Sequence, residues 1–413
     1  MKEKKVFVFE KEKISLYRPE SMEEIEKCVE EIFKENEKIF PKNKNSKILL
    51  KPNFNNDLNA LTGNSTDLRI IVAVLKSLRK RGYKKITIGE GSNCGINHIG
   101  LNVFKRLGID KIAELFNAEL INFNKDDGKK IQLVTGEAKI AKTILNAEFV
   151  INLPVIKTHV EAGMTCACKN YMGALIGTEK RKMHDCLEKN IVRLNEIIKT
   201  DLIIVDGIIC MEGRGPGDGI PKKLGIILSG KNPFLMDLFC TKLIGLDYKK
   251  IKFLQEAIKN NKISEKDIEK IKKINALAKF KPGTKTLADI ILLNNFFIGI
   301  RFSKIFEKVF NKGILPWLLY KIGVKQDKYI LEERDIRGFD FEKKYEGEIK
   351  KCLEEYCPLS LKSPKDKKCI RCMYCYQILP EKINVDGDLR DFEMQMKRFN
   401  KSLQKSLKND RQP

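Results

Sequence analysis

Three cysteines near the C-terminus have the spacing Cys-x-x-Cys-x-x-Cys: Cys369, Cys372 and Cys375. This spacing lets three thiolates from one tight loop bind a single cubane iron–sulfur cluster, as in the bacterial ferredoxin run CxxCxxCxxxCP. The fourth cysteine position of that run is Leu379 here, and the expected Pro380 follows it. Because the fourth cysteine serves the other cluster in two-cluster ferredoxins, this chain lacks a ligand for a second cluster.

Another cysteine, Cys357, precedes this run and is followed by Pro358. It has the form of the last position of an earlier run whose three leading cysteines are missing, since Cys352 is one residue out of step. The cysteine missing at position 379 and the three cysteines missing before Cys357 would all be ligands of the same second cluster. The sequence therefore predicts one 4Fe-4S cluster, with Cys357 and the three cysteines of the run as its ligands.

Other roles for cysteine stay open. Structural zinc usually takes two separated CxxC or CxxH pairs, so a continuous run favours it less, and radical adenosylmethionine enzymes have three residues between their first two cysteines. Cys352 is either a buried thiol or a spare ligand. We expect four more cysteines to be packed in apolar surroundings, since free cysteine behaves as a small hydrophobe. These are Cys28, Cys94, Cys210 and Cys240.

A second group of reactive side chains lies in residues 155–185, which follow the apolar segment FVINLP and hold two of the three histidines. Lys157 and Lys169 suit a phosphate or carboxylate ligand, and His159 or His184 suits proton transfer. The other basic residues of this segment are Lys180, Arg181 and Lys182. The sequence predicts that the lysines orient a small anion. An ordinary solvated basic loop is the alternative.

The same segment also contains thiols close to its histidines. Cys166, Cys168 and Cys186 could join His159 and His184 in holding a metal ion. Their spacing matches no standard ligand set, so the sequence favours a metal here less than the anion site. The role of the three thiols stays open.

The first 250 residues alternate short apolar runs with helical patterns, which predicts an α/β fold with a mostly parallel sheet and crossover helices. The expected strands are residues 47–51, 85–89, 148–153, 202–206 and 224–229. Residues 67–81 predict a helix with one apolar face, capped by Thr66 or Ser65. We expect glycine-rich or polar loops after Leu50, Ile88 and Val205, and a ligand loop in residues 155–185. The carboxyl ends of parallel strands share one ligand crevice.

Four parts of the chain differ in character. We predict an α/β domain over residues 1–280, a helical connector over 281–344, a ferredoxin-like 4Fe-4S module over 345–390 and a basic tail over 391–413. Residues 286–324 are apolar and aromatic. Core or interdomain helices are the simpler interpretation of that segment, and peripheral contact with a membrane surface is the alternative.

Length and charge limit the classes of protein. The 413 residues favour two to three domains. The 79 basic and 55 acidic residues give a net charge of +24, which favours anionic partners. Nucleic acid is a disfavoured partner because no aromatic-interleaved basic motif occurs. Neither a run of 18 apolar residues nor a secretion signal is found, so we expect a reducing cytoplasm.

The chain resembles the family catalogued as domain of unknown function 362, iron–sulfur-associated proteins of anaerobic bacteria and archaea. The resemblance covers residues 47–247 and 357–383. It rests on segments that occur in this order: KPNFN, GEGSN, NLPVIKTH, KNYMGALIG, KRKMHD, VDGIICMEGRGPGDG and the cysteine run. It implies an α/β domain joined to a ferredoxin-like module. Members often carry two full cysteine runs, and this chain departs from them in having one complete run.

The resemblance also implies a set of recurring polar positions that line a ligand crevice. These are Lys51, Asn53, Glu90, Lys157, His159, Lys169, Asn170, His184, Asp206 and Glu212. Residues and resemblance together predict a single-cluster redox protein whose α/β domain binds a small anionic ligand or a redox partner protein. The alternative is a non-enzymatic electron carrier or cluster-based sensor with the α/β domain as a docking scaffold. A structural metal site in a nucleic-acid or lipid-binding protein is a third hypothesis. The sequence does not decide between enzyme and carrier.

Overall fold

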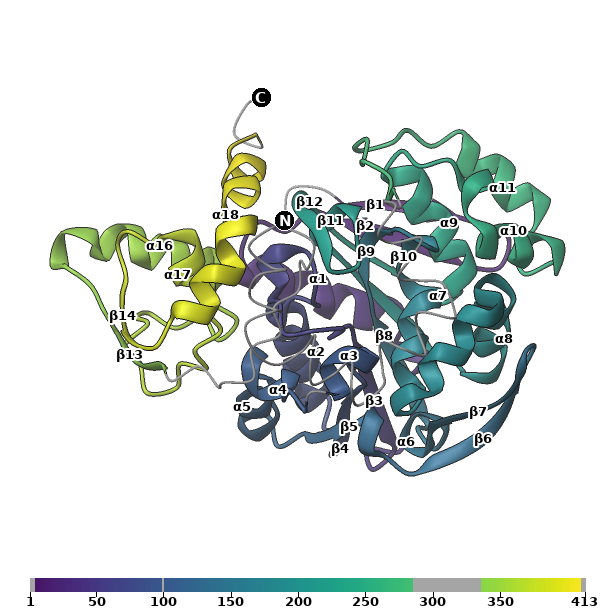
Figure 1. The fold of residues 1–413 in the computed structure, drawn as a ribbon, viewed down its shortest axis with the longest axis horizontal. Coiled ribbons are helices and arrows are strands. Elements are labelled where there is room, and N and C mark those ends of the chain that lie inside the picture. The colour runs from purple at the N-terminus through teal and green to yellow at the C-terminus, as the bar shows by residue number, and fades with distance from the viewer. Residues whose placement is uncertain (1–3, 99, 285–335, 410–413) are drawn as a thin grey trace, which may run out of the picture.

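A ten-stranded mixed sheet forms the centre of the molecule, which is described by a computed structural model for residues 4–98, 100–284 and 336–409 (Figure 1). The strand order is β1-β2-β12-β11-β8-β3-β4-β5, and β9 and β10 pair beside β11. The strands are β1 (Lys4–Val8), β2 (Lys13–Tyr17), β3 (Lys47–Pro52), β4 (Lys85–Glu90), β5 (Glu119–Asn122), β8 (Phe149–Leu153), β9 (Val155–His159), β10 (Gly163–Thr165), β11 (Leu202–Arg214) and β12 (Asp218–Gly230). A separate hairpin joins β6 (Gly128–Leu133) to β7 (Gly136–Ala141).

The five central strands β11, β8, β3, β4 and β5 run parallel. Their side chains alternate between two apolar clusters, because successive residues of a strand point to opposite faces. Ile48 and Leu50 of β3 lie in one cluster and Leu49 in the other. A sheet buried on both faces explains why these strands are continuous apolar runs in the sequence. The prediction of an α/β fold with a mostly parallel sheet is confirmed.

Helices cover both faces of the sheet (Figure 1). On one face lie α1 (Met22–Glu35), α2 (Leu68–Lys80), α4 (Val103–Leu107) and α5 (Ile109–Leu115). On the other lie α7 (Ala167–Asn170), α8 (Leu187–Ile197), α9 (Pro233–Leu243), α10 (Lys252–Lys259) and α11 (Glu265–Lys272). The short helices α3 (Cys94–His98) and α6 (Lys142–Leu145) follow β4 and β7.

Helix α2 confirms the helix predicted for residues 67–81, but its cap differs from the prediction. Asp67 is the N-cap, and its side chain accepts a hydrogen bond from the Arg69 N–H at 2.9 Å. Ser65 and Thr66 instead donate to the carbonyls of Leu58 at 2.6 Å and Leu153 at 2.7 Å. Those two hydroxyls hold the preceding loop to the sheet, so they are not free to cap the helix.

Two segments that we expected to form loops are strands. The glycine-rich residues after Val205 extend β11 and pair with β12 in a long antiparallel hairpin, with Glu212 opposite Ile220. Residues 155–159 form β9. The expectation of an open ligand loop in these two places was wrong. In the hairpin, a partner strand takes up the backbone hydrogen bonds, which local composition does not reveal.

The C-terminal residues form a compact module around the cysteines. It contains β13 (Ile336–Asp340) paired with β14 (Asn384–Gly387), and the helices α16 (Glu346–Tyr356) and α17 (Tyr374–Ile378). The described part of the predicted basic tail belongs to the helix α18 (Arg390–Asn409). Phe392, Met396 and Phe399 form an apolar stripe of α18 that packs in the module core.

Helix α18 also joins the module to the sheet, beside β12 (Figure 1). Arg398 pairs with Asp218 at 2.6 Å, and Ser406 accepts a hydrogen bond from the Lys223 N–H at 2.6 Å. Most of the predicted connector (281–344) and the apolar segment 286–324 lie outside the described residues. Within the described ranges, no helix is long and apolar enough to cross a membrane.

Candidate functional site

Four lysines from four segments gather at the carboxyl end of the parallel strands. Lys51 is the penultimate residue of β3, Lys157 lies on β9, Lys169 on α7 and Lys180 in the 3-10 helix η5 (Gly177–Cys186). The charges of Lys157 and Lys169 act on each other, as do those of Lys51 and Lys180. We call these four residues the lysine cluster. Lys51, Lys157 and Lys180 are buried, whereas Lys169 is partly exposed.

Glu90, at the end of β4, is the buried carboxylate of this cluster. Its Oε1 lies 2.9 Å from Nζ of Lys51. Backbone N–H groups of Phe54 and Gly91 donate to its two oxygens at 3.0 and 2.7 Å. A Cβ atom on Gly173 would lie 2.0 Å from Oε1, so glycine at that position leaves room for the carboxylate. Glu90 compensates part of the positive charge.

A chain of amides holds Lys157 in place. Nζ of Lys157 donates to Oδ1 of Asn53 at 2.7 Å and to the carbonyl of Asn64. Asn53 donates in turn to Asn170 at 2.8 Å. Asn170 then donates to Asn152 at 2.8 Å and to the carbonyl of Lys51 at 3.0 Å. Three predicted residues, Asn53, Lys157 and Asn170, therefore meet in one network with Lys51.

Burial lowers the pKa values of the cluster lysines, because a charged ammonium loses its hydration there. The pKa of Lys157 falls to about 7, through burial and the charge of Lys169. Burial lowers the pKa of Lys169 to about 8 against the attraction of Glu161. Burial also lowers the pKa of Lys180 to about 8, against attraction by Cys94 and Glu90. A bound anion would stabilise the ammonium forms and draw protons onto these lysines.

The two predicted histidines have different surroundings. His159 is buried, and its Nδ1 accepts hydrogen bonds from the N–H groups of Glu161 at 3.0 Å and Ala162 at 3.1 Å. These bonds place the proton of a neutral ring on Nε2. His184 is exposed, and its Nδ1 lies 2.9 Å from Oε2 of Glu161. Glu161 therefore contacts His184 and also attracts the ammonium of Lys169 electrostatically.

Asp206 lies beside this site, in β11. Its two oxygens accept from the N–H groups of Asp67 at 2.8 Å and Ile208 at 3.0 Å. Burial, followed by the neighbouring charge of Asp67, raises the pKa of Asp206 to about 7. The other predicted carboxylate, Glu212, lies farther along the hairpin, where Lys222 and the N–H of Lys281 each bind it at 3.0 Å.

Arg69 connects this edge of the sheet to the cysteine module. It makes a bidentate contact with Asp67, with Nη2 2.6 Å from Oδ2, and both side chains are buried. Its Nη1 donates to the carbonyl of Glu355 at 2.6 Å, and its guanidinium lies 5.1 Å from the ring centre of Tyr356. These residues immediately precede Cys357. One buried arginine therefore anchors the module to α2.

A substitution of Arg69 tests how much this contact contributes to the stability of the protein. Arg69→Leu leaves the Asp67 carboxylate buried without its cation, so we expect unfolding free energy to fall by about 3–5 kcal/mol. Urea unfolding measures the change. The control is Arg81→Leu, which removes a partly exposed pair with Glu30 and costs about 1 kcal/mol or less. Equal losses in the two variants would contradict the anchoring role.

The four predicted cluster cysteines share one feature of their surroundings. Burial raises the pKa of each thiol, and a backbone N–H that follows the cysteine in the chain, one residue on for Cys375 and two residues on for the other three, acts against this rise. The donors are Leu359 for Cys357, Arg371 for Cys369, Tyr374 for Cys372 and Tyr376 for Cys375. Leu361 N–H is a further donor to Cys357, at 3.5 Å. Arg371 and Met373 have φ values of 58° and 67°, which curl the loop between the cysteines.

The four thiols also act on one another electrostatically, with Cys357 influencing the other three. Cys352 is buried nearby, but among the described residues no backbone N–H is directed at its sulfur. Thiolates with N–H donors are the environment that iron–sulfur clusters take, since these hydrogen bonds stabilise negative sulfur. The four predicted ligands are therefore compatible with a 4Fe-4S cluster. Cys352 belongs to the same apolar cluster, and its charge acts on Cys375.

No three His, Cys, Asp or Glu side chains in the described part of the chain are grouped to hold one metal ion. A four-iron cube is wider than a single ion, so its cysteines stand farther apart than the ligands of zinc. The remaining cysteines are free thiols. Cys28, Cys210 and Cys240 are buried as predicted, whereas Cys94 is partly exposed and donates to the Gly177 carbonyl at 3.3 Å.

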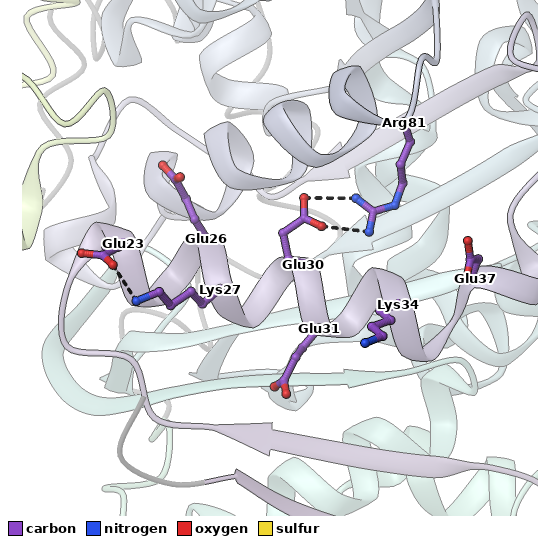
Figure 2. A pocket seen from close by; sticks show the side chains of 8 residues that line it. All are labelled: Glu23, Glu26, Lys27, Glu30, Glu31, Lys34, Glu37 and Arg81. Atoms are coloured by element: carbon purple, nitrogen blue, oxygen red, sulfur yellow. Dashed lines mark hydrogen bonds and ion pairs between the residues drawn. The ribbon is translucent and has the colours of Figure 1, made fainter.

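A hollow on the outer surface of α1 is separate from these groups (Figure 2). Its lining is charged, with Glu23 2.5 Å from Lys27 and Glu30 2.9 Å from Arg81. Glu26, Glu31, Lys34 and Glu37 complete the lining. None of the predicted site residues contributes to it, and its charges are largely paired across the helix surface.

Sequence reasoning missed several residues of the site. Asn152 is the polar residue within the apolar strand FVINLP, which is a signal that could have been used. Lys180 was noted for its charge, but its buried position beside Asn124 and Glu90 was not expected. Asp67 and Arg69 gave no signal, because they open an ordinary amphipathic helix.

Comparison with known proteins supports the resemblance for the α/β part. The family described as "Domain of unknown function (DUF362)" matches residues 48–242. The chain is 27% identical over 214 residues to a thylakoid-associated protein of Synechocystis sp., covering 49% of this chain and 64% of that protein. It thus spans less than two thirds of this relative's length. The lactate racemase apoprotein of Thermoanaerobacterium thermosaccharolyticum matches with 12% identity and a TM-score of 0.35, covering 55% of this chain and 59% of the other.

Proposed function

We propose that this protein transfers electrons through one 4Fe-4S cluster held by the four cysteines and binds a small anionic ligand at the lysine cluster. The observation that carries the proposal is that Cys357, Cys369 and Cys375 pack in one apolar cluster of the module and act electrostatically on Cys372. A backbone N–H that follows each of the four cysteines in the chain acts against the rise of its thiol pKa. Hydrogen bonds of this kind stabilise the negative charge of cluster sulfurs and help to set the reduction potential. When bound, such a cluster supplies one-electron transfer.

The α/β site would bind and orient the anion. Lys169 is partly exposed, and among the described residues no hydrogen-bond acceptor holds its ammonium, so it can turn toward a ligand. Asn53 and the carbonyl of Asn64 hold the ammonium of Lys157 in place. Lys157 therefore contributes positive charge from a buried position. His184, exposed and paired with Glu161, is positioned to exchange a proton with solvent at Nε2.

The alternative is an electron carrier or cluster-based sensor whose α/β domain docks a redox partner protein. One observation favours it: Lys51, Lys157 and Lys180 already donate hydrogen bonds inside the protein. In that case the lysines stabilise the fold and the surface charge around them attracts the partner. The alternative predicts reversible reduction without any turnover that depends on a ligand.

We place the protein in a reducing cytoplasm, because its twelve cysteines are free and a cluster needs thiolates. Peripheral contact with a membrane stays part of the proposal. It is supported by the apolar segment 286–324 of the sequence and by the name of the thylakoid-associated relative. Flotation of the protein with liposomes, without detergent, tests this contact.

The test of the cluster is anaerobic purification with iron, sulfide and zinc quantified per chain, followed by electron paramagnetic resonance of the dithionite-reduced protein. We expect about four iron and four sulfide, with the signal of one cubane. One zinc without labile sulfide would overturn the redox function. About eight iron would show that a second cluster exists and that the ligand set is larger than proposed.

A further inference from the structure

Two buried amides meet where the α/β domain contacts the cysteine module. Nδ2 of Asn59 donates to Oε1 of Gln377 at 2.9 Å, and both side chains are buried. This bond uses the Nδ2 group of Asn59 and the Oε1 atom of Gln377, and it does not involve the other polar atom of each amide. Within the described residues, Nε2 of Gln377 and Oδ1 of Asn59 are enclosed and have no hydrogen-bond partner. Buried amide donors are nearly always paired, so the free Nε2 indicates a partner that the described residues do not supply.

The position of Gln377 identifies that partner. Gln377 lies on α17, two residues after Cys375. Leu58, next to Asn59, packs in the same apolar cluster as Met373 and Cys375. The amide pair therefore lies where the α/β domain contacts the module, two residues along α17 from a predicted cluster ligand. An iron–sulfur cluster presents sulfur atoms that accept hydrogen bonds, and it is the one large acceptor expected there.

We propose that Gln377 donates a hydrogen bond from Nε2 to a sulfur of the 4Fe-4S cluster and that Asn59 fixes the amide for this purpose. The inference rests on the proposed function, because it requires the cluster. Gln377 and Asn59 are positioning residues in this account. A donor to sulfur stabilises the more negative, reduced cluster, so it makes the reduction potential more positive.

The amide pair also connects the two sites. Asn59 belongs to the loop of residues 53–67, whose Asn53 and Asn64 hold Lys157 of the lysine cluster. At its other end, Asp67 of this loop holds Arg69, which contacts the chain just before Cys357. One loop therefore contacts the anion site and the cysteine module. Through Asn59, the α/β domain contributes to the potential of the cluster.

The test uses the full-length protein with its cluster and measures the midpoint potential by a redox titration followed by electron paramagnetic resonance. In Gln377→Leu we expect the equilibrium constant for reduction to fall about tenfold, which is about 59 mV for a one-electron couple. Asn59→Leu should shift the potential in the same direction by less. The matched control is Gln255→Leu on α10, whose Nε2 donates to the Tyr248 carbonyl at 3.1 Å, far from the module in sequence. Its potential should equal that of the unmodified protein.

Iron and sulfide analysis distinguishes failure of the proposed function from failure of the inference about Gln377. An unmodified protein without cluster iron would overturn the proposed function and this inference with it. A Gln377→Leu protein with full iron and sulfide and an unchanged potential would overturn the inference alone. If Gln377→Leu does not retain its cluster, Gln377→Glu preserves the size of the side chain and replaces the donor with a carboxylate. A loaded Gln377→Glu protein should then have a more negative potential, and an unchanged one overturns the inference.

Discussion

Cys372→Ala is expected to abolish the cluster, with iron and sulfide falling from about four per chain to near zero and the resonance signal lost. Cys372 lies in the middle of the run and is half-buried, and the charges of Cys357, Cys369 and Cys375 act on its thiol. Removing one of four thiolates leaves an iron without its protein ligand. Anaerobic purification with metal and sulfide analysis measures the loss.

Cys352→Ala is the matched control, because Cys352 is a buried cysteine of the same module that we do not count as a ligand. We expect this variant to keep its iron and its signal. Equal loss of iron in both variants would contradict the ligand assignment and make Cys352 a fifth candidate. Retention of the complete cluster in Cys372→Ala would remove Cys372 from the ligand set.

Lys169→Met is expected to weaken binding of inorganic phosphate roughly tenfold to a hundredfold, which corresponds to about 1.5–3 kcal/mol for a charge-assisted hydrogen bond. Lys169 is the partly exposed member of the lysine cluster, so the substitution removes a charge that solvent can reach, with little change to the core. Isothermal titration calorimetry measures the affinity. Phosphate serves as the probe anion, and a dicarboxylate serves as the comparison.

Lys182→Met is the control for this prediction. Lys182 lies in the same short segment as Lys180, is exposed and pairs with Glu179 at 2.9 Å. Its removal lowers the net charge by the same amount, so we expect nearly unchanged affinity. Equal weakening in Lys169→Met and Lys182→Met would indicate a general charge effect and would contradict a defined site.

The affinity for the anion should depend on pH in a known direction. In the free protein the pKa of Lys157 is about 7, and the pKa values of Lys169 and Lys180 are about 8. The ammonium forms bind the anion, so affinity is fully present below about pH 7 and falls as pH rises through 7 to 8. Binding at pH 7.5 should also take up protons from the buffer. Constant affinity between pH 6 and 9 would contradict the role of these lysines.

Local pattern made part of the fold predictable. Apolar runs such as residues 47–51 and the one-sided helix at 67–81 depend on neighbouring residues in the sequence, so periodicity was sufficient to locate β3 and α2. The hairpin after Val205 was missed because its pairing joins two segments that are both rich in glycine, and such composition is equally typical of a loop. The cap of α2 was missed because Ser65 and Thr66 bond to distant carbonyls.

The sequence by itself determined which residues can form the cysteine site, since ligand type and spacing within one loop are properties of the chain. Only the tertiary structure decided the composition and the chemistry of the lysine cluster. Asn53 and Lys157 are 104 residues apart in the sequence, and Lys51 meets Glu90 across two strands. The lowered lysine pKa values follow from burial, and the spacing of residues in the sequence does not show which lysines are buried. The same holds for Asn59 and Gln377, which are 318 residues apart and become partners because the module packs against the loop after β3.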